Sequence, residues 1–202
     1  MRLRPIVMLL GGLAAALTLA GCGESDGGSE PAHGMDMGRS SSSSPMASEG
    51  EAVDIAFAQV MIPHHQQAVA MADLAAQHAK SSGVQSLSAQ IKSAQGPEIE
   101  QMTAWLEEWG APMEMSEGEH DMGGMTMFGM MTDDAMAALA ESRGASFDRM
   151  WLQMMIAHHQ GAIQMAQDVL EESSNDDVIA MAEAIVEGQK AEINTMEQLL
   201  GR

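Results

Sequence analysis

The chain has 202 residues, a formal net charge of −20, and 22 methionines beside only 3% aromatic residues. So acidic a chain repels nucleic acid, which excludes nucleic-acid binding, and a single cysteine excludes an internal disulfide. An apolar fraction of 46% suffices for one hydrophobic core. The many methionines either fill space in this core or have a role that only their sulfur atom can perform.

Residues 1–21 have the layout of a signal peptide. Arg2 and Arg4 precede an apolar run that is too short to span a bilayer and is followed at once by polar sequence. The run ends Leu19-Ala20-Gly21-Cys22, which resembles a bacterial lipobox. This resemblance implies cleavage before Cys22, acylation of that cysteine, and an extracytoplasmic protein anchored to the cell membrane by lipid. The alternative is a plain secretory signal with an incidental cysteine.

The following segment, 22–50, is rich in Gly, Ser and Glu and contains two prolines. Such a composition cannot bury a core, so it predicts a flexible tether between the membrane and a folded domain over 51–202.

The folded part has helical periodicity in four long stretches. We expect a helix over 51–80 with a kink or break at Pro63, a turn over 81–83, and a helix over 84–109. A Gly- and Met-rich crossover, 113–131, and a short helix from Asp133 to about Ser142 come next. The last two helices are expected over 145–172 and, with Asn175 as N-cap, up to about Leu200.

The first and third long helices are copies of one another. Residues 61–72 (MIPHHQQAVAMA) return as residues 155–166 (MIAHHQGAIQMA), and the same offset of 94 positions relates Gln95-x2-Glu98-Ile99-x2-Met102 to Gln189-x2-Glu192-Ile193-x2-Met196. A duplicated helix pair predicts an all-α fold: a ferritin-like antiparallel four-helix bundle with halves 51–112 and 145–202 about a pseudo-twofold axis.

Each copy holds a His-His pair bracketed by methionines. The candidate metal ligands are Met61, His64, His65 and Met71 in the first copy and Met155, His158, His159 and Met165 in the second. Adjacent side chains on a helix point about 100° apart, so the two rings of a pair flank the core stripe and need not share one ion. If the two helices meet, four imidazoles and several thioethers could converge between them. The alternative is that these histidines are purely structural.

Copper is the metal that suits this ligand set. Thioethers are soft, neutral ligands for Cu(I), and imidazole suits copper in either oxidation state, whereas zinc makes little use of methionine. Secondary ligands are expected in the crossover, at His120, Met122, Met125, Met127, Met130 and Met131. The alternative for that segment is an apolar flap over the end of the bundle.

Glu98 and Glu192 lie on the apolar stripes of their helices, where polar groups must be paired. Hydrogen bonds from these carboxylates to the imidazoles would orient the rings as metal ligands. A buried contact between helices, with no metal involved, explains the same residues equally well.

These motifs resemble the bacterial "domain of unknown function 305" family, with its Met-x-x-His-His-x-x-Ala-x-x-Met-Ala helix followed by a Gln-x-x-Glu-Ile-x-x-Met helix. The resemblance covers residues 51–202. It implies a ferritin-like fold and a copper-related role, since members include extracytoplasmic copper-binding proteins implicated in copper resistance, and it carries over no enzymatic activity.

Three functions follow as hypotheses. The first is a lipid-anchored copper-binding protein, not an enzyme, that buffers or relays Cu(I)/Cu(II), with a copper exporter or oxidase as candidate partner. The second is a dinuclear metal oxidase, which lacks the Glu-x-x-His motif that such bundles use. The third is an interaction protein that binds peptides on methionine-lined surfaces.

Overall fold

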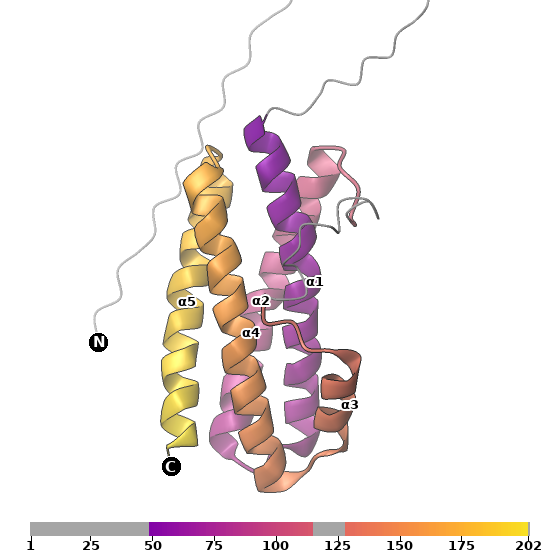
Figure 1. The fold of residues 1–202 in the computed structure, drawn as a ribbon, viewed down its shortest axis with the longest axis vertical. Coiled ribbons are helices and arrows are strands. Elements are labelled where there is room, and N and C mark those ends of the chain that lie inside the picture. The colour runs from indigo at the N-terminus through magenta and orange to yellow at the C-terminus, as the bar shows by residue number, and fades with distance from the viewer. Residues whose placement is uncertain (1–48, 115–127, 202) are drawn as a thin grey trace, which may run out of the picture. The chain divides into compact units, whose positions relative to one another are not determined.

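The computed structural model describes residues 49–114 and 128–201, and in these ranges the chain forms five helices and no strand (Figure 1). The helices are α1 (Glu49–His78), α2 (Ser82–Glu108), α3 (Asp133–Glu141), α4 (Gly144–Glu172) and α5 (Asp176–Leu200). The expected signal peptide, Cys22, residues 22–48 of the expected tether and residues 115–127 of the crossover lie outside the described residues, whereas tether residues 49 and 50 belong to α1. The domain boundaries therefore stay predictions.

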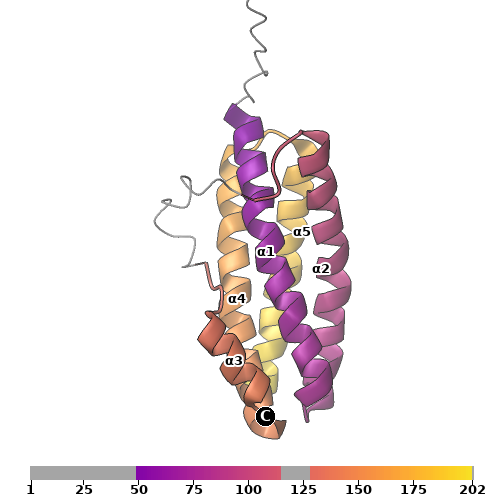
Figure 2. The same ribbon diagram turned by 90° about the vertical axis from the view of Figure 1, so that its right-hand side faces the viewer.

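The helices pair as the repeat predicts. Helix α1 packs along α2 and α4 packs along α5, and the two pairs meet chiefly where α1 lies against α4 (Figures 1 and 2). The all-α four-helix bundle is thereby confirmed. The short α3 contacts both α1 and α4 on one face of the bundle. None of the helices in the described ranges is long and apolar enough to cross a membrane.

Polar side chains cap the first turns of α2, α3 and α5. Ser81 accepts a hydrogen bond from Val84 N, Thr132 from Ala135 N, and Asn175 from Asp177 N and Val178 N, which satisfies amides that have no partner in the first turn. Because Ser81 is the cap, Ser82 and the residue after it already belong to α2. The sequence had placed them in a turn.

Helix α1 continues without a break across Pro63. Of the expected kink or break, the break is wrong, because both halves of α1 pack in the core and this packing outweighs the loss of one backbone donor. The proline side chain itself is exposed, so it costs no core packing.

Replacing Pro63 with alanine should therefore stabilise the protein. The change restores a backbone donor inside a formed helix, and we expect the free energy of unfolding to rise by about 1–2 kcal/mol. Urea denaturation followed by circular dichroism measures this. An exposed alanine-to-glycine change at Ala70 on the same helix serves as the control and should lower stability by about 1 kcal/mol. A destabilised Pro63→Ala protein would mean that a distortion of α1 at the proline is needed for packing.

Helices α1 and α4 run antiparallel, with a pseudo-twofold axis between them. His64 of α1 meets His158 of α4, which is its own counterpart in the repeat. Met71 lies seven residues after His64, and its carbonyl oxygen accepts a hydrogen bond of 2.9 Å from Nε1 of Trp151, which lies seven residues before His158. A residue that meets its own counterpart must lie on the symmetry axis. The axis thus passes through the histidine motif.

Candidate metal centre

His64 and His158 are in direct contact at the centre of the bundle. Their ring centroids lie 3.7 Å apart with 34° between the ring planes, and both side chains are fully buried. They come from opposite helix pairs, since α1 carries His64 and α4 carries His158. The duplicated motif has therefore placed two imidazoles side by side on the pseudo-twofold axis.

Burial keeps both rings neutral. It lowers the pKa of His64 from 6.5 to about 3, with further lowering by the neighbouring His65 and His159, although a hydrogen bond to the Phe128 carbonyl opposes the shift. Burial also lowers the pKa of His158 well below 6.5, with His64 as the next cause, and the nearby backbone of His64 opposes this only weakly. A neutral imidazole has a nitrogen lone pair, which is the form that binds a metal ion.

The second histidine of each pair turns away from the axis toward the other helix of its own half. His65 Nε2 donates to Glu98 Oε2 on α2 at 2.8 Å, and His159 Nε2 donates to Glu192 Oε2 on α5 at 2.6 Å. Each ring lies 6.4 Å from its neighbour in the motif, with 52° between planes in both halves. The two expected hydrogen bonds are present, while their role in orienting metal ligands stays a prediction.

The buried ring nitrogens of the motif carry lone pairs that have no hydrogen-bond donor. His64 Nε2 donates to the carbonyl oxygen of Phe128 at 2.9 Å, so in the neutral ring Nδ1 carries the lone pair. The same reasoning assigns the lone pair to Nδ1 of His65 and His159 when those rings are neutral. All four Nδ1 atoms are buried and lack a hydrogen-bond partner, as does Nε2 of His158. Buried lone pairs without a donor are costly unless a ligand uses them.

The motif methionines are buried on both sides of the histidines. Met61 and Met165 belong to the core cluster on one side, and Met71 and Met155 to the cluster on the other. Each is at most 7% exposed. A role as core packing accounts for this burial as well as a role as metal ligands does. In the ranges 49–114 and 128–201, no three His, Cys, Asp or Glu side chains form a group able to hold a metal ion.

A short stretch of the crossover, which we call the strap (residues 128–131), lies directly over His64 and His158. Its first residue accepts the His64 hydrogen bond, and its last residue, Met131, exchanges two hydrogen bonds with the Gln67 side chain, at 2.7 and 2.9 Å. Met131 also packs against the core cluster that contains Met71. The strap thus closes the bundle face above the imidazole pair.

Two glycines allow the strap to come this close. Gly129 has a φ of +76°, which favours glycine, and a Cβ there would collide with the backbone of Ala157. A Cβ on Gly161 of α4 would overlap the carbonyl of Phe128. The sequence does hold a signal for this, because Gly161 is a point where the copies differ: its counterpart is Gln67, which binds the strap from the other helix.

The interior amides are less well satisfied than the sequence suggests. Both side-chain polar atoms of Gln95 and the Oε1 of Gln189 are buried without a partner. The paired polar residues on these helices are instead Glu98 and Glu192. Each glutamine lies on the same helix face as the glutamate, one turn before it, where no histidine reaches it.

Fold and site together define a duplicated helical bundle with paired, buried, neutral histidines on its symmetry axis. The family model described as "Domain of unknown function (DUF305)" matches residues 54–200. The chain therefore belongs to the DUF305 family, as its motifs indicate.

Solved structures of the family resemble this chain over most of its length. A candidate secreted DUF305 protein from Streptomyces coelicolor is 33% identical with a TM-score of 0.69, covering 74% of this chain and 92% of that one. A DUF305 fragment from Deinococcus radiodurans is 33% identical with a TM-score of 0.68, covering 77% and 99%. CopM in its Cu(II)-bound form is 31% identical with a TM-score of 0.62, covering 73% and 95%. CopM has also been solved with Cu(I) and with silver bound. No curated protein sequence matches this chain significantly.

Proposed function

We propose that this protein is an extracytoplasmic, lipid-anchored copper-binding protein that buffers or relays Cu(I) and Cu(II) without catalysing a reaction. The observation that carries the proposal is the pair of neutral, buried imidazoles on the pseudo-twofold axis, each with an unpartnered nitrogen. Such nitrogens need a ligand, and copper in either state accepts imidazole. CopM, which shares the fold at 31% identity, has been crystallised with copper.

The inner histidines, His64 and His158, would supply nitrogen donors, and the motif methionines would supply soft thioether donors suited to Cu(I). Silver is a soft monovalent ion like Cu(I), so its presence in a CopM structure agrees with a soft-metal site in the family fold. Neutral donors need no deprotonation, which favours binding in mildly acidic surroundings.

The outer histidines, His65 and His159, would be held in position by the carboxylates of Glu98 and Glu192. A ring whose far nitrogen donates to a carboxylate has a fixed orientation and a more basic lone pair. Glu98 and Glu192 are each engaged by one imidazole, which leaves them less suited to bridge two hard metal ions as in dinuclear oxidases. We therefore propose binding and not oxidase chemistry.

A Cu(I) competition titration against a chromophoric chelator tests this proposal. The full chain is compared with a His64→Ala/His158→Ala variant, a His65→Ala/His159→Ala variant, and a His78→Ala control on α1 outside the motif. We expect affinity to fall at least about 100-fold in the first variant, by about 10- to 100-fold in the second, and not at all in the control. Circular dichroism verifies that each variant keeps its helices.

Two other results would redirect the proposal. Unchanged Cu(I) affinity in both histidine variants would make these residues structural and shift the ligands to the methionine-rich crossover. Absence of copper binding by the unaltered chain would reject the copper proposal and favour an interaction protein.

Mass spectrometry of the N-terminal peptide from cells tests the anchor, which requires diacylglycerol on Cys22.

A further inference from the structure

The bundle face formed by α1 and α4 carries two grooves that the pseudo-twofold axis relates, and the residues that the structure describes cover only one of them. The strap lies over the axis at the centre of this face, and α3 continues from it to one side (Figure 1). On that side Leu139 of α3 is fully buried in the cluster that holds Met71, Ala75 and Trp151.

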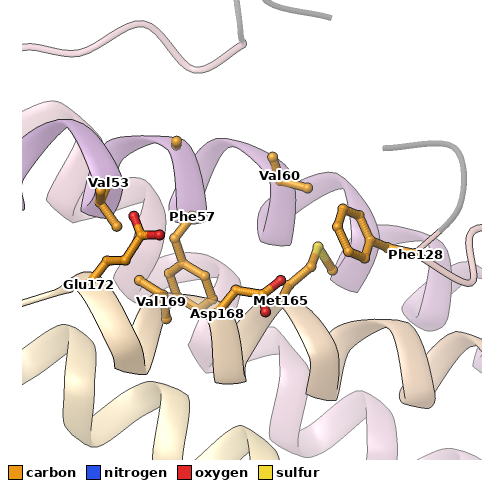
Figure 3. A pocket seen from close by; sticks show the side chains of 9 residues that line it. Val53, Phe57, Val60, Phe128, Met165, Asp168, Val169 and Glu172 are labelled. Carbon is orange, nitrogen blue, oxygen red and sulfur yellow. The ribbon is translucent and has the colours of Figure 1, made fainter. Parts of the chain in front are cut away.

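The groove on the other side is open. It has a volume of about 350 Å³ and lies between the N-terminal half of α1 and the C-terminal half of α4, with Phe128 at the strap end (Figure 3). Phe57 and Val60 of α1 face Met165 and Val169 of α4 across it. Phe57 is the counterpart of Trp151, and Met165 is the counterpart of Met71, so this is the groove that α3 fills in the other half.

The two grooves differ in charge. The open groove is edged on α4 by the carboxylates of Asp168 and Glu172. Their counterparts in the covered groove are Leu74 and His78. An apolar floor with an acidic edge complements a helix that has an apolar face flanked by basic side chains.

Neither the tether nor the crossover has the basic charge of such a helix. The tether and the crossover are both acidic: residues 23–48 contain Glu24, Asp26, Glu30 and Asp36 against a single Arg39, and residues 113–127 contain acidic but no basic side chains apart from His120. Like charges would oppose docking of either segment, or of a second copy of this acidic chain, beside Asp168 and Glu172.

We infer that the open groove is a docking site for a partner protein, which inserts a short amphipathic helix carrying lysine or arginine beside its apolar face. The helix takes the place that α3 takes in the other half of the bundle. The groove shares Met165 with the candidate metal ligands, but the inference rests on the shape and charge of the groove and does not depend on copper binding.

Fluorescence anisotropy of a labelled, stapled peptide tests the inference on the full chain. The probe repeats residues 133–141 of α3 with lysine in place of Asp133, Asp134 and Glu141, and the control peptide keeps the acidic residues. We expect saturable binding of the basic peptide and binding at least about tenfold weaker of the acidic one, because only the former complements the groove edge.

Matched variants locate the binding. Ala56→Trp fills the groove and should abolish binding, whereas Ala52→Trp, at an exposed position of α1 outside the groove, should leave it unchanged. Asp168→Asn/Glu172→Gln should weaken it at least about tenfold, and the same charge change on α5, Glu183→Gln/Glu187→Gln, should not.

Three results would overturn the inference. One is the absence of saturable binding by the basic peptide, and another is equal binding of both peptides. The third is a dimer, detected by light scattering, that Ala56→Trp abolishes and Ala52→Trp preserves, since the occupant would then be a second copy.

Discussion

The metal-free protein should lose about 2 kcal/mol of its unfolding free energy between about pH 7 and about pH 5 through His64 alone, and His158 should add to this loss. The pKa of His64 is lowered to about 3 and that of His158 also lies well below 6.5, in both cases chiefly by burial. In the unfolded chain both rings bind a proton near pH 6.5, but in the folded protein they do not. The contribution of His64 to stability is therefore complete above about pH 6.5 and is lost as the pH falls from there toward about 3, and the contribution of His158 is lost in the same direction.

Urea denaturation at several pH values, with a chelator present, measures this dependence. Carboxylates also contribute to acid sensitivity, so the informative quantity is the difference between proteins. A His64→Gln/His158→Gln variant should show a much shallower pH dependence between about pH 7 and about pH 5, because glutamine binds no proton. His78→Gln, which removes a partly exposed histidine of α1, should retain the steep dependence. Equal slopes in all three proteins would show that the inner rings are not held neutral by burial.

Bound copper should protect the protein from this acid loss. A ligand that binds only the folded state adds stability, and a metal on the imidazole nitrogens competes with protons for the same lone pairs. The comparison of the pH dependence with and without copper thus links the stability measurement to the proposed site.

The sequence predicts the bundle well because its evidence is local and repeated. The helix ends follow from residues such as Asn175 and Thr132, whose side chains cap the next turn, and the pairing of helices follows from the constant offset between the copies. The divergence of adjacent histidines likewise follows from helix geometry, and the structure separates His64 from His65 accordingly.

The sequence does not predict how far the four imidazoles converge, because that depends on the distance and rotation between α1 and α4. The structure brings only His64 and His158 into contact, while His65 and His159 bind carboxylates of α2 and α5. Nor does periodicity locate the strap, which is held by backbone contacts and single hydrogen bonds. The departure from symmetry at Gly161 becomes informative only once the neighbour of that residue is known.

Replacing Gly161 with glutamine, the residue at its counterpart Gln67, should displace the strap and destabilise the protein by about 3 kcal/mol. A Cβ at this position would overlap the Phe128 carbonyl. The backbone of Gly161 is fixed in α4, and the Phe128 carbonyl is fixed by the close approach of Gly129 to Ala157, so the overlap can be relieved only by moving the strap. Moving it breaks the hydrogen bond from His64 Nε2 to Phe128 and the two bonds between Gln67 and Met131.

The displaced strap should also change the imidazole pair beneath it. Water would reach His64, and its pKa should rise toward 6.5 because burial is the main cause of the low value. Loss of the hydrogen bond to Phe128 lowers the pKa, but this effect is smaller than that of burial. Nitrogen NMR of the histidine rings reports both the pKa and the position of the ring proton, which the structure places on Nε2. Gly188→Gln, at an exposed site of α5 where a Cβ meets no atom, is the matched control and should leave stability and both NMR signals close to those of the parent protein. If Gly161→Gln leaves the His64 signals and the unfolding free energy unchanged as well, the strap does not close over the histidines in solution.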